Sequence, residues 1–150
     1  MRTFLLITLL VSPAFAQTTG TWRMNPDKST GNDEAPLPRS LLIRCEPHPD
    51  GEAATIWRIT EDGRSETVSM ILRYDGRDHP HLLEEGFDAV SARKRENGDI
   101  EVAYKRDGKV VSRQIRRLTP DGQQMTIHLQ FLSKTGTWLK GVMVFEKQRE

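Results

Sequence analysis

Short turn signals recur along most of the chain, and each of them ends in a glycine that follows a turn-favouring residue. They occupy residues 47–51, 62–63, 97–98, 107–108, 120–122 and 134–136. Because turns this short reverse the chain, each segment between them is expected to pair antiparallel with the next. Beyond residue 16, no segment shows a sustained apolar period of 3.6 residues, which would indicate a helix. The sequence therefore predicts an all-β fold built as an antiparallel up-and-down meander.

The predicted strands occupy residues 20–26, 40–46, 53–61, 65–73, 87–95, 99–106, 109–118, 123–132 and 137–146. One helical turn is predicted over 80–86, because Pro80 stands near its start and Gly86 at its end. A meander leaves two bare edges unless the sheet closes, so we expect a barrel of about eight to ten strands. The last strand would then meet the first, with Trp22 filling the floor of the barrel. A β-sandwich is the alternative.

The start of the chain has the layout of a secretory signal peptide. Arg2 gives a positive start, residues 4–11 form an apolar run, and a small-x-small cleavage site ends at Ala16. The apolar run is too short to cross a bilayer core, which needs about 20 residues. We therefore expect a signal peptide over 1–16, a single domain over 17–150, and a periplasmic or secreted protein that is not inserted in the membrane after cleavage.

Cleavage would remove Arg2 and leave 21 basic residues against 21 acidic ones. Proteins that bind nucleic acid or an anionic membrane usually carry more basic than acidic residues, so a neutral chain argues against both partners. The single cysteine, Cys45, cannot form an internal disulfide and falls on an apolar segment. We expect a buried, inert thiol, with stability supplied by packing and by the sheet.

Alternation along the strands predicts which side chains face the interior. On segment 123–132, apolar residues alternate with Thr126, His128 and Gln130. The inward set there is Met125, Ile127, Leu129 and Phe131. On segment 99–106 the inward set is Ile100, Val102 and Tyr104.

Two arginines have directions that depend on the neighbouring turns. If Asp107 and Gly108 form a two-residue loop, Arg113 pairs with Val102 and points inside among apolar side chains. A guanidinium there is costly unless an anion meets it, so Arg113 would be the cationic end of a pocket for an amphipathic carboxylate. A bulge near Gly108 would instead turn Arg113 outward, and a position near the open end would let it reach water. The sequence alone leaves these alternatives open.

The second arginine, Arg93, lies before Asn97 and Gly98. A two-residue loop there would bury Arg93, whereas a three-residue turn would bury Val90 and Ala92. We expect the three-residue turn, because it gives a more apolar wall.

Four motifs share their order and spacing with a known type of protein. They are Gly-Thr-Trp-Arg-Met-Asn-Pro-Asp-Lys-Ser at 20–29, Arg-Tyr-Asp-Gly at 73–76, Asp-Gly-Lys-Val-Val at 107–111 and Val-Phe-Glu-Lys at 144–147. With Gly20 and Trp22 matching a Gly-x-Trp signature, the chain resembles small secreted bacterial proteins of the lipocalin-like (calycin) type, mostly of unknown function. The mid-chain signatures and paired cysteines of many lipocalins are missing.

The resemblance implies a barrel of about eight to ten strands in which Trp22 packs at the closed end. It also implies a basic side chain over that ring, either Lys147 or Arg149. By analogy with the family, the ligand would be a small apolar molecule.

His79 and His81, beside Asp78, form the one cluster in the sequence that resembles metal ligands. Pro80 constrains their geometry and no further ligand has diagnostic spacing, so we predict surface loop histidines, no metal and no other cofactor. The sequence contains no motif for a catalytic nucleophile, converging carboxylates or a phosphate-binding loop. Nothing in it supports an enzyme.

The sequence hypothesis is an exported, monomeric, non-enzymatic barrel that binds a small apolar or amphipathic molecule. The candidate ligand-binding residues are Arg113, Tyr104, Phe131, Leu129 and Met125. The alternative is a protein-interaction or inhibitor module acting through the rim loops 25–40 and 74–86, and an enzyme of unmarked chemistry is the third class. An unfilled interior would favour the first, and a solidly packed barrel the second.

Overall fold

A computed structural model describes residues 18–82 and 86–150, so the signal peptide predicted over 1–16 lies outside the described residues. Within those residues, ten strands form one antiparallel sheet in the order β4-β3-β2-β1-β10-β9-β8-β7-β6-β5. The strands are β1 (Gly20–Thr30), β2 (Ser40–His48), β3 (Gly51–Ile59), β4 (Ser65–Arg73), β5 (His79–Pro80), β6 (Ala89–Lys94), β7 (Ile100–Arg106), β8 (Lys109–Leu118), β9 (Gln124–Leu132) and β10 (Trp138–Lys147). The predicted all-β meander is confirmed, and a single sheet excludes the sandwich.

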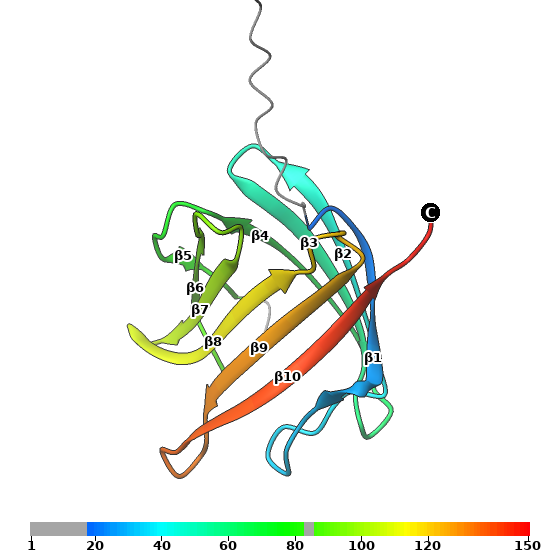
Figure 1. The fold of residues 1–150 in the computed structure, drawn as a ribbon. Helices are drawn as coiled ribbons and strands as arrows, with labels where there is room; N and C mark the ends of the chain where they lie inside the picture. The colour runs from blue at the N-terminus through cyan, green and yellow to red at the C-terminus, as the bar shows by residue number, and fades with distance from the viewer. Residues whose placement is uncertain (1–17, 83–85) are drawn as a thin grey trace, which may run out of the picture.

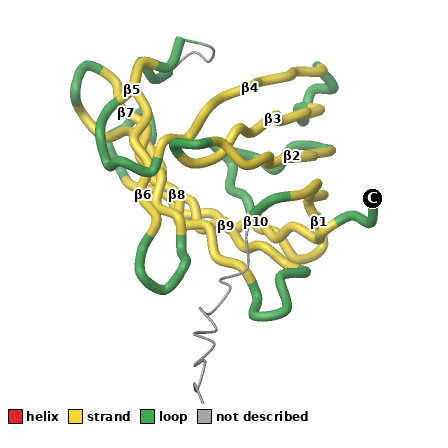
Figure 2. The backbone as a smooth tube through the Cα atoms, turned by 90° about the horizontal axis from the view of Figure 1, so that it is seen from above, coloured by secondary structure: helices red, strands yellow, loops and turns green. Residues whose placement is uncertain are grey.

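The last strand meets the first, as predicted. Trp22 of β1 lies opposite Lys147 of β10, and the pairing continues to Asn25 and Val144. The sheet curls around an interior face, with β2–β4 on one side and β5–β8 on the other (Figures 1 and 2). Its two edges approach each other, because β4 contacts β6 and the Gly76 N–H donates to the Ala92 carbonyl at 2.9 Å. The result is a curled half-barrel whose interior can hold a core.

Strand β1 runs past Pro26, where the sequence predicts its end. Residues 26–29 form a bulge, since Asn25 pairs with Val144 and Thr30 already pairs with Val142. A proline is tolerated in a bulge because no ladder hydrogen bond is required of it there. The Ser29 hydroxyl takes the place of a backbone acceptor and receives the Val144 N–H at 2.9 Å.

Strand β6 has the direction that the sequence favours, with Val90 and Ala92 buried and Arg93 outside. The helical turn predicted over 80–86 is wrong at its start, because Pro80 belongs to β5 and pairs with Ala89. Residues 83–85 of that turn lie outside the described residues.

The tightest packing lies at the end of the half-barrel where β1 begins, which we call the closed end. Its largest buried side chains are Trp22, Cys45, Leu72, Val102, Met125, Ile127 and Phe145. The opposite end, where β2 begins and β3 finishes, is the open end. Within the described residues, no helix is long and apolar enough to cross a membrane.

Candidate functional site

The closed end is built around Trp22, whose side chain is fully buried. Its indole N–H donates to the Thr18 carbonyl at 2.6 Å, and the Lys147 ammonium lies 5.6 Å from the ring centroid. Gly20 makes room for this arrangement, because it has a φ of +127° and a Cβ there would lie 2.8 Å from Lys147 Cε. Of the two basic residues implied by the lipocalin resemblance, Lys147 is the one over the ring.

A buried ion pair lies beside this packing. Arg116 of β8 donates to the Glu52 carboxylate of β3 at 2.6 Å, and both side chains are nearly inaccessible to solvent. The Thr18 hydroxyl donates to the second Glu52 oxygen at 2.5 Å. Burial alone lowers the pKa of Arg116, but the negative charge of Glu52 raises it and the net shift is upward. Arg116 therefore stays charged inside the half-barrel.

On β8, Arg116 faces inward and Arg113 does not. Asp107 and Gly108 do form a two-residue loop, with φ values of 50° and 76°. After the pair of Lys105 with Val110, however, Val111 is an extra residue that forms a bulge. Tyr104 therefore pairs with Ser112, and Ala103 pairs with Arg113. A one-residue shift moves every following side chain to the other face, and Arg113 lies exposed on the outside.

The other predicted ligand-binding residues lie on the interior face. Phe131 pairs with Ser112, which pairs with Tyr104, so these three form one row across β7–β9. Leu129 lies in the next row with Gln114, and Met125 lies deepest, at the closed end. Leaving Arg113 aside, the sequence assigned these side chains to the correct face.

The interior is packed at the closed end and accessible toward the open end. On β9, Met125 and Ile127 have 0% and 1% of their surface exposed, whereas Leu129 and Phe131 on the same face are only partly buried. Burial also decreases toward the open end along the inward faces of three other strands. The partly buried members are Ile56 and Arg58 on β3, Ser112 and Gln114 on β8, and Leu139 and Met143 on β10.

A hollow of about 580 Å³ opens at this end, and we call it the mouth hollow. Leu41 and Met143 supply its apolar wall, and Pro36 and Pro38 border it from the loop between β1 and β2. Its remaining lining residues are Arg58, Thr60, Glu61, Asp62, Arg64 and Glu66. The hollow therefore joins an apolar interior to a charged rim.

Four of the charged side chains at the rim form ion pairs with each other. The Arg58 guanidinium donates to Glu66 Oε2 at 2.8 Å and 2.5 Å, and Arg64 Nε donates to Asp62 at 2.9 Å. The Arg58–Glu66 pair is partly buried and the Arg64–Asp62 pair is exposed, so both are reachable from water. They suit a polar headgroup that stays near solvent while an apolar body enters the hollow.

The two candidate metal ligands have different surroundings. His79 pairs with Asp75, whose carboxylate is 2.9 Å from its Nε2. His81 is buried, contrary to the prediction of a surface loop. Its ring packs against two aromatic rings, with centroid distances of 5.4 Å to Phe87 and 6.1 Å to Tyr104. Within the described ranges, no group of three or more potential ligands converges on one point.

Cys45 is buried, as the sequence predicts, and it lies close to Glu52 and Arg116. Burial and then the charge of Glu52 raise the pKa of its thiol to about 12. The thiol is therefore unreactive at neutral pH.

Comparison of the sequence with protein-family models and with curated proteins gives no match. Among solved structures, the fold is similar to that of zebrafish ileal bile acid-binding protein, crystallised in complex with cholic acid. The similarity has a TM-score of 0.54, covers 87% of this chain and 98% of the zebrafish chain, and comes with 12% sequence identity. At that identity the similarity establishes the fold, an all-β half-barrel of the calycin type.

Proposed function

We propose that this protein is an exported, non-enzymatic barrel that binds a small apolar or amphipathic molecule, which enters through the mouth hollow. The observation that carries this proposal is the change of burial along β9. In a completely filled barrel, Leu129 and Phe131 would be as buried as Met125 and Ile127. They are only partly buried instead, which supports the proposal that a guest covers them toward the open end.

The partly buried side chains of the interior face indicate the class of guest. Leu129, Phe131, Leu139 and Met143 present apolar surface, and each fully covered apolar side chain contributes about 1.5–3 kcal/mol. Ser112 and Gln114 add neutral polar groups in the rows of Phe131 and Leu129, and the paired charges lie at the rim. An amphipathic molecule with a compact apolar body matches this order of surfaces.

The zebrafish neighbour, whose structure holds cholic acid, supports the proposal through its fold. Cholic acid is itself amphipathic, which makes it a sensible first probe. The rim-interaction alternative has less support, because Leu37 of the loop between β1 and β2 packs against the core rather than presenting itself to a partner.

The test is to fill the interior and compare binding. Leu129→Trp adds bulk on the inward face of β9, and Leu132→Trp adds the same bulk on the outward face of the same strand. Isothermal titration with sodium cholate and sodium dodecanoate should show weaker binding by Leu129→Trp and unchanged binding by Leu132→Trp. Equal affinities in both variants, or no binding of either probe by the wild type, would refute the proposal.

A further inference from the structure

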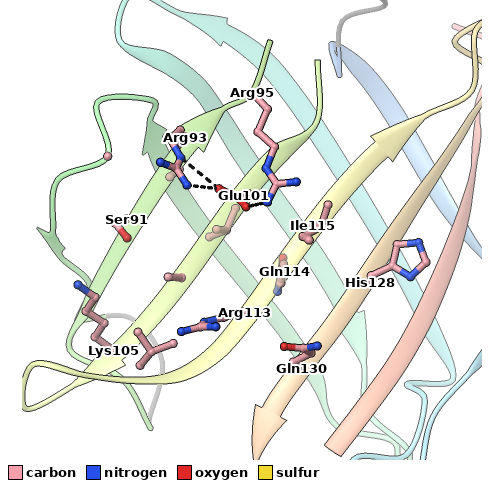
Figure 3. Close-up of a pocket in the computed structure, with 15 residues that line it drawn as sticks. Ser91, Arg93, Arg95, Glu101, Lys105, Arg113, Gln114, Ile115, His128 and Gln130 are labelled. Carbon is pink, nitrogen blue, oxygen red and sulfur yellow. Dashed lines mark hydrogen bonds and ion pairs between the residues drawn. The ribbon is translucent and has the colours of Figure 1, made fainter. Parts of the chain in front are cut away.

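The outer face of β6–β9 carries a second hollow, which we call the outer pocket (Figure 3). It has a volume of about 580 Å³ and is separated from the interior by the sheet itself. The charged and amide residues that line it and point to the outer face include Arg93, Arg95, Glu101, Lys105, Arg113 and Gln130. Ala103, Val110 and Ile115 give it a partly apolar floor.

Cations outnumber carboxylates in this pocket. Arg93 donates to Glu101 at 2.6 Å and Arg95 donates to the same carboxylate, so that one negative charge serves two guanidinium groups. Lys105 is paired with Asp78 at 2.8 Å. The chain as a whole is close to neutral, so this excess is a property of the pocket rather than of the whole surface.

Arg113 occupies the centre of this arrangement, between Lys105 and Gln130 (Figure 3). Its guanidinium carbon lies 5.8 Å from the centroid of the Trp138 ring. An arginine held against an aromatic ring keeps N–H groups available for an anion. Its cross-strand neighbours, Ala103 and Gln130, are uncharged and do not neutralise it.

The bulge in β8 is what directs Arg113 into the outer pocket. Without the extra residue Val111, Arg113 would pair with Val102 and face the interior. Bulges often re-aim a side chain at a functional site. Here the same bulge produces two results at once, since it directs Arg116 to Glu52 inside and Arg113 to the outer pocket.

We propose that the outer pocket binds the phosphate or sulfate group of a small molecule, with Arg113 as the principal ligand and Gln130 and Lys105 as further donors. A tetrahedral oxyanion offers oxygens in several directions, which suits donors that arrive from β7, β8 and β9. A planar carboxylate would satisfy the Arg113 fork and offer no further oxygen to Gln130 and Lys105. The volume exceeds that of the inorganic anion, so the organic part would cover Ala103, Val110 and Ile115.

The test uses phenyl phosphate and phenyl sulfate as probes, with benzoate as the carboxylate analogue. Amide shifts are recorded at constant ionic strength while each probe is added to the wild type, to Arg113→Gln and to Arg44→Gln. Arg44 is an exposed arginine on the outer face of β2, paired with Glu46, and serves as the matched control. A charge-assisted bidentate contact corresponds to a change in affinity of roughly tenfold to hundredfold.

The expected result is saturable shifts centred on Arg113 and Gln130 with one or both tetrahedral probes, weakened at least about tenfold by Arg113→Gln and unchanged by Arg44→Gln. Absence of saturable shifts, equal affinity of Arg113→Gln, or equal affinity for benzoate would overturn the inference. Cholate binding by Arg113→Gln is measured alongside and should match the wild type, so failure of the outer pocket and failure of the interior site are distinguished.

Discussion

Arg116 and Glu52 meet across 2.6 Å at the closed end, although their strands, β8 and β3, are not neighbours in the sheet. The pair therefore links the two sides of the half-barrel through its interior. Removing two charges from water is costly, and that cost is offset only while the two charged groups remain paired with each other. The closed end is thus sensitive to the loss of either partner.

Arg116→Met should destabilise the protein by about 3–5 kcal/mol, because it leaves the Glu52 carboxylate buried without a counter-charge. The double variant Glu52→Leu, Arg116→Met should recover most of that loss, since no buried charge remains. Urea unfolding followed by tryptophan fluorescence measures both changes. A single-variant loss below about 1 kcal/mol would mean that the pair is exposed in solution.

Trp22→Ala should cost about 3–5 kcal/mol, because a fully buried aromatic side chain leaves a cavity in tight packing. Trp57→Ala is the matched control, since Trp57 lies on β3 with 40% of its surface exposed. Its loss should stay near or below about 1 kcal/mol. Similar losses in the two variants would contradict the packing described for the closed end.

Stability should fall as the pH rises above about 9, the range in which Cys45 begins to titrate in the unfolded chain. The folded-state pKa of Cys45 is raised to about 12, so between these values the folded state holds a proton that the unfolded state releases. Stability present below pH 9 is therefore lost progressively toward pH 12. Burial also raises the pKa of Tyr74, which acts in the same direction.

Urea unfolding of the wild type and of Cys45→Ala at pH 8, 9, 10 and 11 measures this dependence. The wild type should lose more stability over the series than Cys45→Ala does. Parallel curves for the two proteins would show that the thiol is not buried in the folded state.

Much of the fold follows from local signals. The alternation along 123–132 assigned the inward face of β9 correctly, and the turn signals delimited β4 and β8 at the residues where the structure has them. These signals are local, because each depends only on a strand's period or on the residues of a single turn. The all-β meander required nothing more.

The direction of Arg113 could not be predicted in the same way. The loop at Asp107 and Gly108 is as the sequence suggests, and the extra residue Val111 comes only afterwards. The resulting register brings Arg116 to Glu52, a tertiary contact between residues far apart in the chain that no local signal reports. A bulge near Gly108 exchanges the two faces of the strand, and this alternative already implied that Arg116 faces inward. It is the signal in the sequence that could have identified Arg116 as an interior residue.

Export remains a prediction from the sequence. If residues 1–16 are removed as a signal peptide, material recovered outside the cytoplasm should begin at Gln17. N-terminal sequencing of the exported protein measures this directly. A sequence that begins at Met1 would contradict it.

The central claim is that a guest occupies the interior toward the open end, and methyl NMR tests it most directly. Leucine, isoleucine and methionine methyl groups are labelled, and sodium cholate is added. Saturable shifts of Leu129, Leu139 and Met143 are expected, with much smaller shifts of Met125 and Ile127 in the filled closed end. Shifts confined to the outward-facing Leu132, or no shifts at all, would contradict it.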